Sequence, residues 1–186
     1  MALLVERSRR LFTIEEYHRM AETGILRPDD RVELIDGEIF EMSPIGSRHM
    51  ACVNNLNRVF VLGLGVRAVV SPQNPVQIPR YSEPEPDLAV LRARSYKTFA
   101  PTTEDVLLLV EVAETSLRFD RTVKLALYAR AGFLEYWLVD ANAETVTIFR
   151  RPANETYSDV RTVGINERLS PLVFPDLVID VADLFA

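Results

Sequence analysis

The chain has 186 residues, of which 48% are hydrophobic and 26% are charged, so we expect one ordinary α/β or α+β domain over residues 1–186. Its formal net charge of −6 and its pI of about 5.1 are the reverse of the basic footprint of most nucleic-acid-binding domains. The single cysteine, Cys52, excludes an intramolecular disulfide framework and a cysteine-bound zinc site.

The N-terminal third predicts a helix and a hairpin. Thr13-Ile14-Glu15-Glu16 has the form of a capping box, which opens a helix that runs to about Glu22. The Asp36-Gly37 pair, favoured in tight turns, separates two alternating runs at 31–35 and 38–42. We therefore expect an antiparallel hairpin there.

The middle of the chain predicts a second helix and four strands. Apolar residues recur at helical spacing over 47–62, and glycines follow that stretch. Two short strands are expected at 66–70 and 75–78. The runs 87–91 and 106–112 are short and nearly continuously apolar, which is typical of central strands that are covered on both faces. We expect these two strands to be neighbours.

The remaining residues predict a third helix and a second half of the sheet. Residues 120–131 have helical periodicity, with Arg121, Lys124 and Tyr128 on a stripe separate from the apolar one. A strand at 135–140 follows the helix and completes a βαβ unit. The last expected elements are edge strands at 144–150 and 157–163 and a terminal segment with a short helix at 178–185.

Two carboxylates in the central strands indicate a metal site. A charge inside an apolar strand is costly unless a cation lies near it, and Glu111 interrupts such a run while Asp87 begins the neighbouring one. With the carbonyl of Val112, these side chains would supply the oxygen ligands that Mg²⁺ or Mn²⁺ prefers. Alternatively, Glu111 forms a structural ion pair with an arginine, and Asp87 caps a turn after Pro86.

Lys124 is a candidate because the chain contains only two lysines, the other being Lys97. A compact ammonium group can orient a nucleophilic water and stabilise phosphate charge. The alternative is a solvated lysine on the helix surface, paired with Asp120 four residues before it.

Several sequence strings together resemble the PD-(D/E)XK nuclease superfamily and its Uma-type restriction endonuclease family. The resemblance covers about Leu11 to the C-terminus, which leaves residues 1–10 as an N-terminal extension. It is carried by VELIDGEIFEMSPIGSRH, SPQNPVQIP, YSEPEPDLAVL, LLLVEVAETS and DRTVKLALYARAGFLEYWLVD.

The resemblance implies a restriction-endonuclease-like mixed central β-sheet flanked by helices. It makes Pro86-Asp87 the family's PD pair and Glu111 its second acid, and it makes Asp87, Glu111 and Lys124 the catalytic residues. The superfamily's usual lysine, two residues after the acid, is replaced by Ala113. Lys124, from the following helix, would deliver its ammonium group to the same point.

Further site residues follow from the same likeness. Glu33 matches an upstream glutamate that would be a third metal ligand, or it alternates outward on its strand beside Arg31. Four residues are candidates for substrate binding or support of the site: Arg121, Tyr128, His49 and Gln73. A lone histidine such as His49 is otherwise a packed or solvent-facing side chain.

The function implied is metal-dependent hydrolysis of phosphodiester bonds in DNA, with Mg²⁺ or Mn²⁺ as the cofactor. A homodimer is expected because cutting both strands of a duplex takes two active sites. A catalytically silent binding or assembly module on the nuclease fold is the alternative, and a hydrolase of small phosphoesters is a third. No apolar run approaches the roughly 20 residues of a membrane span, and the first residues lack a signal-peptide pattern, so a cytoplasmic protein is expected.

Overall fold

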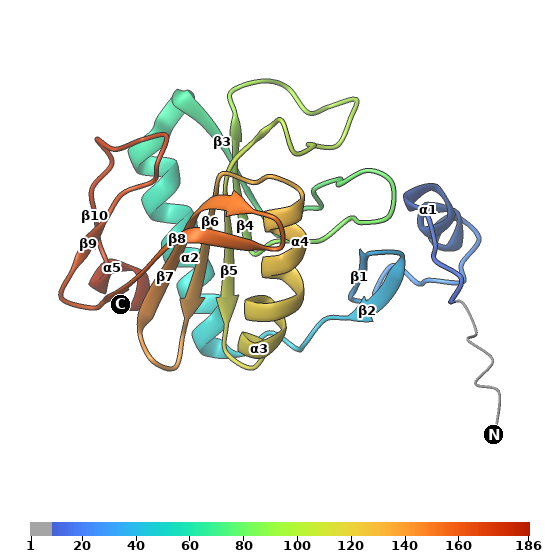
Figure 1. The fold of residues 1–186 in the computed structure, drawn as a ribbon, viewed down its shortest axis with the longest axis horizontal. Coiled ribbons are helices and arrows are strands. Elements are labelled where there is room, and N and C mark those ends of the chain that lie inside the picture. Colours follow the sequence, from blue (N-terminus) through green and yellow to red (C-terminus); the bar gives the residue numbers. More distant parts are fainter. Residues whose placement is uncertain (1–8) are drawn as a thin grey trace.

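The computed structural model describes residues 9–186 and places a six-stranded mixed sheet between helices (Figure 1). Strands β5 and β6 are parallel, and every other neighbouring pair in this sheet is antiparallel. The mixed sheet predicted from the sequence is therefore confirmed. In spatial order the strands are β3 (Ala68–Pro72), β4 (Leu88–Arg92), β5 (Val106–Ala113), β6 (Glu135–Asp140), β7 (Thr145–Ala153) and β8 (Thr156–Gly164).

Helices cover the two faces of the sheet. The long helix α2 (Ser47–Leu64) packs on one face and is followed by the short 3-10 helix η1 (Gly65–Arg67). A continuous helical segment covers the other face. It consists of α3 (Leu117–Phe119), the π-helical turn η2 (Asp120–Lys124) and α4 (Leu125–Arg130).

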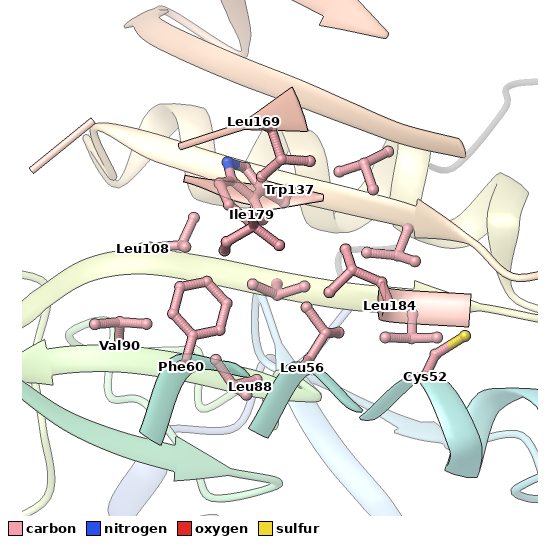
Figure 2. Packing of buried hydrophobic residues seen from close by; sticks show 14 of the residues in the cluster. Cys52, Leu56, Phe60, Leu88, Val90, Leu108, Trp137, Leu169, Ile179 and Leu184 are labelled. Atoms are coloured by element: carbon pink, nitrogen blue, oxygen red, sulfur yellow. The ribbon is translucent and has the colours of Figure 1, made fainter. Parts of the chain in front are cut away.

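Each face of the sheet has its own apolar core, because successive side chains of a strand point to opposite faces. Phe60 of α2 packs against Trp137 of β6, with ring centroids 5.7 Å apart, in the core on the α2 side (Figure 2). Tyr136 and Leu138 belong to the core on the α4 side. Burial of side chains of this size stabilises the fold by about 1.5–3 kcal/mol each.

The N-terminal elements are α1 (Ile14–Glu22) and the hairpin β1 (Val32–Ile35) and β2 (Glu38–Glu41). The capping box is confirmed, since Glu16 donates from its amide to Thr13 Oγ1 at 3.2 Å and accepts from the Thr13 amide at 3.1 Å. The hairpin is also confirmed. Its two turn residues have positive φ values of 50° at Asp36 and 79° at Gly37, as such a tight turn requires.

The C-terminal elements return to helix α2. Strands β9 (Arg168–Leu169) and β10 (Ile179–Asp180) pair with each other, and α5 (Ala182–Phe185) follows. Leu184 is fully buried in the core on the α2 side. No helix among residues 9–186 is long and apolar enough to cross a membrane.

Three details differ from the sequence prediction. Residues 75–78 form only isolated bridges, at Gln77 and Ile78, because the prolines at 75 and 79 lack the amide donors that a ladder needs. Strand β7 is an interior strand between β6 and β8, not an edge. The third helix begins at Leu117 and contains a π-helical turn. Most of the extension predicted over residues 1–10 lies outside the described residues.

Candidate active site

A cavity of about 610 Å³ lies between the N-terminal hairpin and the helical segment that follows β5. The ends of β4 and β5 contribute its acidic floor. Residues 40–45, which lead from β2 towards α2, form one wall, and residues 115–124 form the opposite wall. In Figure 1 the chain leaving β2 passes α3 on its way to α2.

Strand alternation decides which buried acids reach this cavity. Val110 and Val112 pack in the core on the α2 side, so Glu111 between them faces the α4 side. Leu88 also packs towards α2, and it pairs with Val110 across the two strands. Asp87, the residue before β4, therefore lies beside Glu111 on the α4 face. The predicted adjacency of the two strands is confirmed.

The π-helical turn places Lys124 beside the carboxylates. Its Nζ lies 3.0 Å from Oε1 of Glu111 and 3.0 Å from Oε2 of Glu33, and its side chain is only 4% exposed. Asp120 begins the same turn and is also buried. The interpretation of Lys124 as a solvated surface residue is therefore wrong, because the wide turn directs both of its ends inward.

Burial controls the protonation of this cluster. Burial raises the pKa of Glu111 well above its usual range, although the charge of Lys124 opposes the shift. Burial alone would lower the pKa of Lys124, but Glu111 and Glu33 outweigh it and raise that pKa. Burial also raises the pKa of Asp120, to about 6. The positive charge of Lys124 thus offsets the electrostatic cost of burying these carboxylates close together.

Asp87 is held at both of its oxygens. Oδ2 accepts a hydrogen bond from the amide of Val112 at 2.8 Å, and Oδ1 lies 2.8 Å from Nε2 of His49. Burial lowers the pKa of His49, but the hydrogen bond and charge of Asp87 outweigh it, so the net shift is upward. Nδ1 of His49 is buried and has no hydrogen-bond partner among residues 9–186. Asp87 is therefore not a turn cap.

His49 is positioned by the start of helix α2. The N-cap of this helix is Gly46, which has no side chain to cap it. Oε2 of Glu114, just after β5, accepts instead from the amide of His49 at 3.1 Å. A Cβ at position 46 would lie 2.1 Å from that same oxygen, so a larger residue there would displace the carboxylate from this position.

Glu33 belongs to the cluster through the N-terminal hairpin. It is 3% exposed, and its Oε2 accepts from the amide of Glu85 at 3.2 Å in addition to pairing with Lys124. The interpretation in which Glu33 alternates outward is therefore wrong. Burial, followed by the charge of Glu33, raises the pKa of Glu85.

Tyr128 lies behind the cluster and not in the cavity. Its hydroxyl donates to Oε1 of Glu111 at 2.6 Å, and the residue is fully buried. Because the side chain does not line the cavity, it is placed to hold Glu111 and not to touch a substrate. One oxygen of Glu111 thus takes the bonds from both Lys124 and Tyr128.

Two of the predicted residues lie away from the cavity. Gln73 and Arg121 are both exposed, and neither lines it. The sequence placed Arg121 on the stripe of Lys124 by α-helical spacing, but the π-helical turn changes the angular step between successive residues and turns Arg121 outward.

Other residues of the cavity were missed from the sequence. Arg31 and Arg118 are the exposed cations of its lining, and Glu85 and Glu114 add two further carboxylates. Glu85 had a usable signal, since it lies two residues before Asp87 and so shares its side in an extended chain. The arginines had none, because Arg31 lies just before β1 and Arg118 lies in the three-residue helix α3, which is too short to show a periodic pattern.

Two features of the carboxylate cluster bear on its ability to bind a metal ion. Among residues 9–186, no three His, Cys, Asp or Glu side chains converge on one point, because Lys124 stands between Glu33 and Glu111. However, Oε1 of Glu33 and Oε2 of Glu111 accept no hydrogen bond within the described residues, and both residues line the cavity. Mg²⁺ is typically bound by one or two carboxylates together with water and substrate oxygens, so this donor set fits it.

Two solved structures are similar to this chain in fold or in part. The crystal structure of a "putative nuclease belonging to DUF820" from Anabaena variabilis is similar, with a TM-score of 0.73 and 16% identity over 94% of this chain and 97% of that one. The type IIG restriction endonuclease BpuSI is 23% identical over 62% of this chain and 14% of that chain, with a TM-score of 0.39. No curated protein matches the sequence.

The family assignment rests on the sequence as a whole. The profile of the Uma2 family, described as "Putative restriction endonuclease", matches residues 14–182, which includes every acid of the cluster and Lys124. The resemblance and the nuclease fold predicted from the sequence are both confirmed. The chain belongs to the Uma2 family of restriction endonuclease-like proteins.

Proposed function

We propose that this protein is a Mg²⁺- or Mn²⁺-dependent endonuclease that hydrolyses phosphodiester bonds in DNA. One observation carries the proposal, namely that Nζ of Lys124 lies 3.0 Å from carboxylate oxygens of both Glu33 and Glu111 in a cavity that Asp87 also lines. Membership of a family of restriction endonuclease-like proteins supports the nuclease class.

Asp87 and Glu111 would hold the metal ion, with the carbonyl of Val112 and with Glu33 as further oxygen donors. When bound, a divalent ion supplies a water of lowered pKa and neutralises the charge that develops on the phosphoryl group. Hard oxygen ligands suit Mg²⁺ and Mn²⁺ better than they suit softer metals.

Lys124 would position the attacking water. An ammonium group has three donors, and in the structure two carboxylates lie at hydrogen-bonding distance from it. The third donor is available to a water molecule on the cavity side. The two carboxylates fix the direction of the group, so little conformational freedom is lost when it binds the nucleophile.

His49 and Tyr128 would act as positioning residues. Nε2 of His49 holds one oxygen of Asp87, and the hydroxyl of Tyr128 holds one oxygen of Glu111. Each contact restrains the rotamer of an acid, and that acid still lines the cavity. Exposed Arg31 and Arg118 are the lining residues suited to contact phosphate.

A catalytically silent binding module on the same fold is the second candidate. It is favoured by the pairing within the cluster, since Lys124 satisfies Glu33 and Glu111 while His49 satisfies Asp87, without any ion. The acidic net charge of −6 favours it as well. The two candidates differ in whether a divalent ion alters the protein's activity and stability.

The proposal is tested by incubating supercoiled plasmid and circular single-stranded DNA with the protein at low salt in Mn²⁺, Mg²⁺ or EDTA. Wild type is compared with Glu111→Gln and Lys124→Ala. Lys97→Ala is the matched control, because Lys97 is the chain's other lysine and is exposed outside the cavity.

We expect metal-dependent cleavage by wild type and Lys97→Ala, and a loss of about 10²- to 10³-fold in the other two variants. Cleavage that survives Lys124→Ala would remove Lys124 from the reaction. No cleavage by wild type, together with no thermal stabilisation by Mn²⁺, would favour the silent module. The predicted homodimer is checked separately by sedimentation velocity with and without DNA.

A further inference from the structure

The lining of the cavity combines two chemistries. The carboxylates and Lys124 described above supply its charged part. Its apolar part is supplied by side chains from both walls: Phe40, Met42, Ile45, Phe119 and Val123. A site that only bound the phosphates of a nucleic acid would have no need of these apolar side chains, because phosphates are recognised by charge and by hydrogen-bond donors.

Two aromatic rings of this apolar part lie against each other and form an aromatic corner. Phe40 of β2 and Phe119 of α3 have ring centroids 5.2 Å apart and planes inclined by 54°. Both side chains are half-buried, so each contributes to the core and keeps part of its surface towards the cavity. Aromatic faces of this kind are the usual platform for a nucleobase in proteins that bind single strands.

The charge of the cavity argues against a bound duplex. Its lining holds seven aspartate and glutamate side chains against three lysine and arginine side chains. A duplex is bound mainly by neutralising many backbone phosphates, which takes an extended basic surface. The lining residues provide only Arg31 and Arg118 as exposed cations, enough for one or two phosphates.

The volume suits one unit of a nucleic acid. About 610 Å³ is within the range of roughly 300–1,000 Å³ that small-molecule sites occupy. A base can enter such a cavity only when it is unpaired and unstacked, as in a single strand, a flap or a flipped nucleotide.

We infer that the apolar part of the cavity lining binds the base of an unpaired nucleotide, and that the protein therefore acts on single-stranded nucleic acid in preference to duplex. The base stacks on the accessible part of Phe119 beside Phe40, which places the adjoining phosphodiester over Asp87 and Glu111. The inference rests on the proposed function for its choice of a nucleic acid, and it adds the substrate class.

The test is a binding measurement in EDTA, so that metal-dependent cleavage plays no part. A fluorescein-labelled 12-nucleotide strand is titrated with the protein and followed by fluorescence anisotropy. Its duplex and a 12-unit strand of abasic nucleotides are measured alongside it. The abasic strand keeps all the phosphates and removes the bases, so it isolates the contribution of the apolar part of the lining.

The matched variants are Phe119→Leu and Phe99→Leu. Leucine at position 119 keeps an apolar side chain against the core and removes the aromatic face. Phe99 is 45% exposed and lies outside the cavity lining, so it controls for the loss of a surface ring. Thermal melting of both variants verifies that they remain folded.

We expect the single strand to bind at least tenfold more tightly than the duplex or the abasic strand. Phe119→Leu should weaken single-strand binding by about 5- to 100-fold, the range of one base–aromatic stack, while Phe99→Leu leaves it unchanged. Equal affinity for strand and duplex, or an unchanged affinity in folded Phe119→Leu, would overturn the inference. So would competition by a free mononucleotide as strong as that by the unlabelled strand, since the occupant would then be a small nucleotide.

Failure of this inference differs from failure of the proposed function. A protein that cleaves duplex and single strand equally well, with no dependence on Phe119, keeps the nuclease activity and loses the base pocket. A protein that binds the single strand through Phe119 and cleaves nothing keeps the base pocket and loses the nuclease activity.

Discussion

Glu111 and Glu135 are carboxylates buried in neighbouring strands, β5 and β6, but their surroundings differ. Glu135 is 1% exposed and accepts hydrogen bonds from the indole of Trp137, the guanidinium of Arg150 and the amide of Leu172. Both of its oxygens are used, and it lines no part of the candidate cavity. Glu111 takes two bonds on one oxygen only and lines that cavity.

The difference shows how a buried charge that holds the fold is distinguished from one that is available for chemistry. Two nitrogens of the Arg150 guanidinium lie within 2.8 Å of Oε1 of Glu135, and the amide of Leu172 donates to Oε2, so that the site around Glu135 is closed. A single ammonium is shared between Glu33 and Glu111, which leaves oxygens facing the cavity. Burial by itself is therefore no guide to function, whereas incomplete pairing beside a cavity is.

The largest expected effect on stability is at the closed site, which consists of Glu135 and its partner Arg150. Arg150→Met leaves Glu135 buried without its cation, so we expect the free energy of unfolding to fall by about 3–5 kcal/mol in urea denaturation. The cleavage rate per folded molecule should stay the same. Arg161→Met removes an exposed pair with Glu167 and should cost less than about 1 kcal/mol. A loss below that value in Arg150→Met would break the comparison.

The open site consists of Glu33, Glu111 and Lys124. Removal of Lys124 from it should cost less stability. In Lys124→Met, the cavity lets water or an added ion reach Glu33 and Glu111, so we expect a loss of about 2–3 kcal/mol in EDTA. Saturating Mn²⁺ should raise the melting temperature of this variant more than it raises that of wild type. Equal shifts in the two proteins would show that Lys124 does not compete with a divalent ion for Glu33 and Glu111.

A third prediction concerns pH. Burial raises the pKa of Asp120 from 3.8 to about 6, so the charged form is disfavoured in the folded state. The protein therefore loses stability as pH rises from about 4 to about 6. Asp120→Asn should be more stable than wild type by about 2 kcal/mol at pH 8, with no gain below pH 4. Urea denaturation at both pH values measures this, and a gain that is equal at both would contradict the assignment.

The smallest expected effect on stability concerns Tyr128, the uncharged hydrogen-bond donor to Glu111. Tyr128→Phe removes one hydrogen bond to Glu111 and leaves the bond from Lys124, so we expect a stability loss of about 1.5 kcal/mol. Cleavage should fall by about tenfold through a lower kcat, because Glu111 is held less firmly. Tyr157→Phe is the control, since that hydroxyl has no partner within residues 9–186. A raised KM with unchanged kcat would instead indicate that Tyr128 contacts substrate.

Local patterns predicted most of the elements. The capping box at Thr13, the Asp36-Gly37 turn and the apolar runs of β4 and β5 are short-range signals, and each is confirmed. The strand predicted over residues 75–78 is wrong for a local reason, since the prolines at positions 75 and 79 prevent a regular ladder. The interior position of β7 depends instead on tertiary pairing with β6 and β8.

The candidate site shows the same division. Glu111 and Lys124 could be singled out from the sequence, because one interrupts an apolar strand and the other is one of two lysines. Arg121 and Gln73 could not be rejected, since their orientation depends on a π-helical turn and on a loop with a positive φ of 49° at Gln73. The cavity's arginines and its aromatic corner gave no local signal at all.

By itself, therefore, the sequence determined the family, the mixed sheet with its neighbouring central strands, and the acids and the lysine worth suspecting. The tertiary structure decided which of them meet. Strand alternation is encoded locally and brings Asp87 and Glu111 to one face. The approach of Glu33 from a separate hairpin and of Lys124 from a π-helical turn depends on packing between segments far apart in the chain, and no local pattern records it.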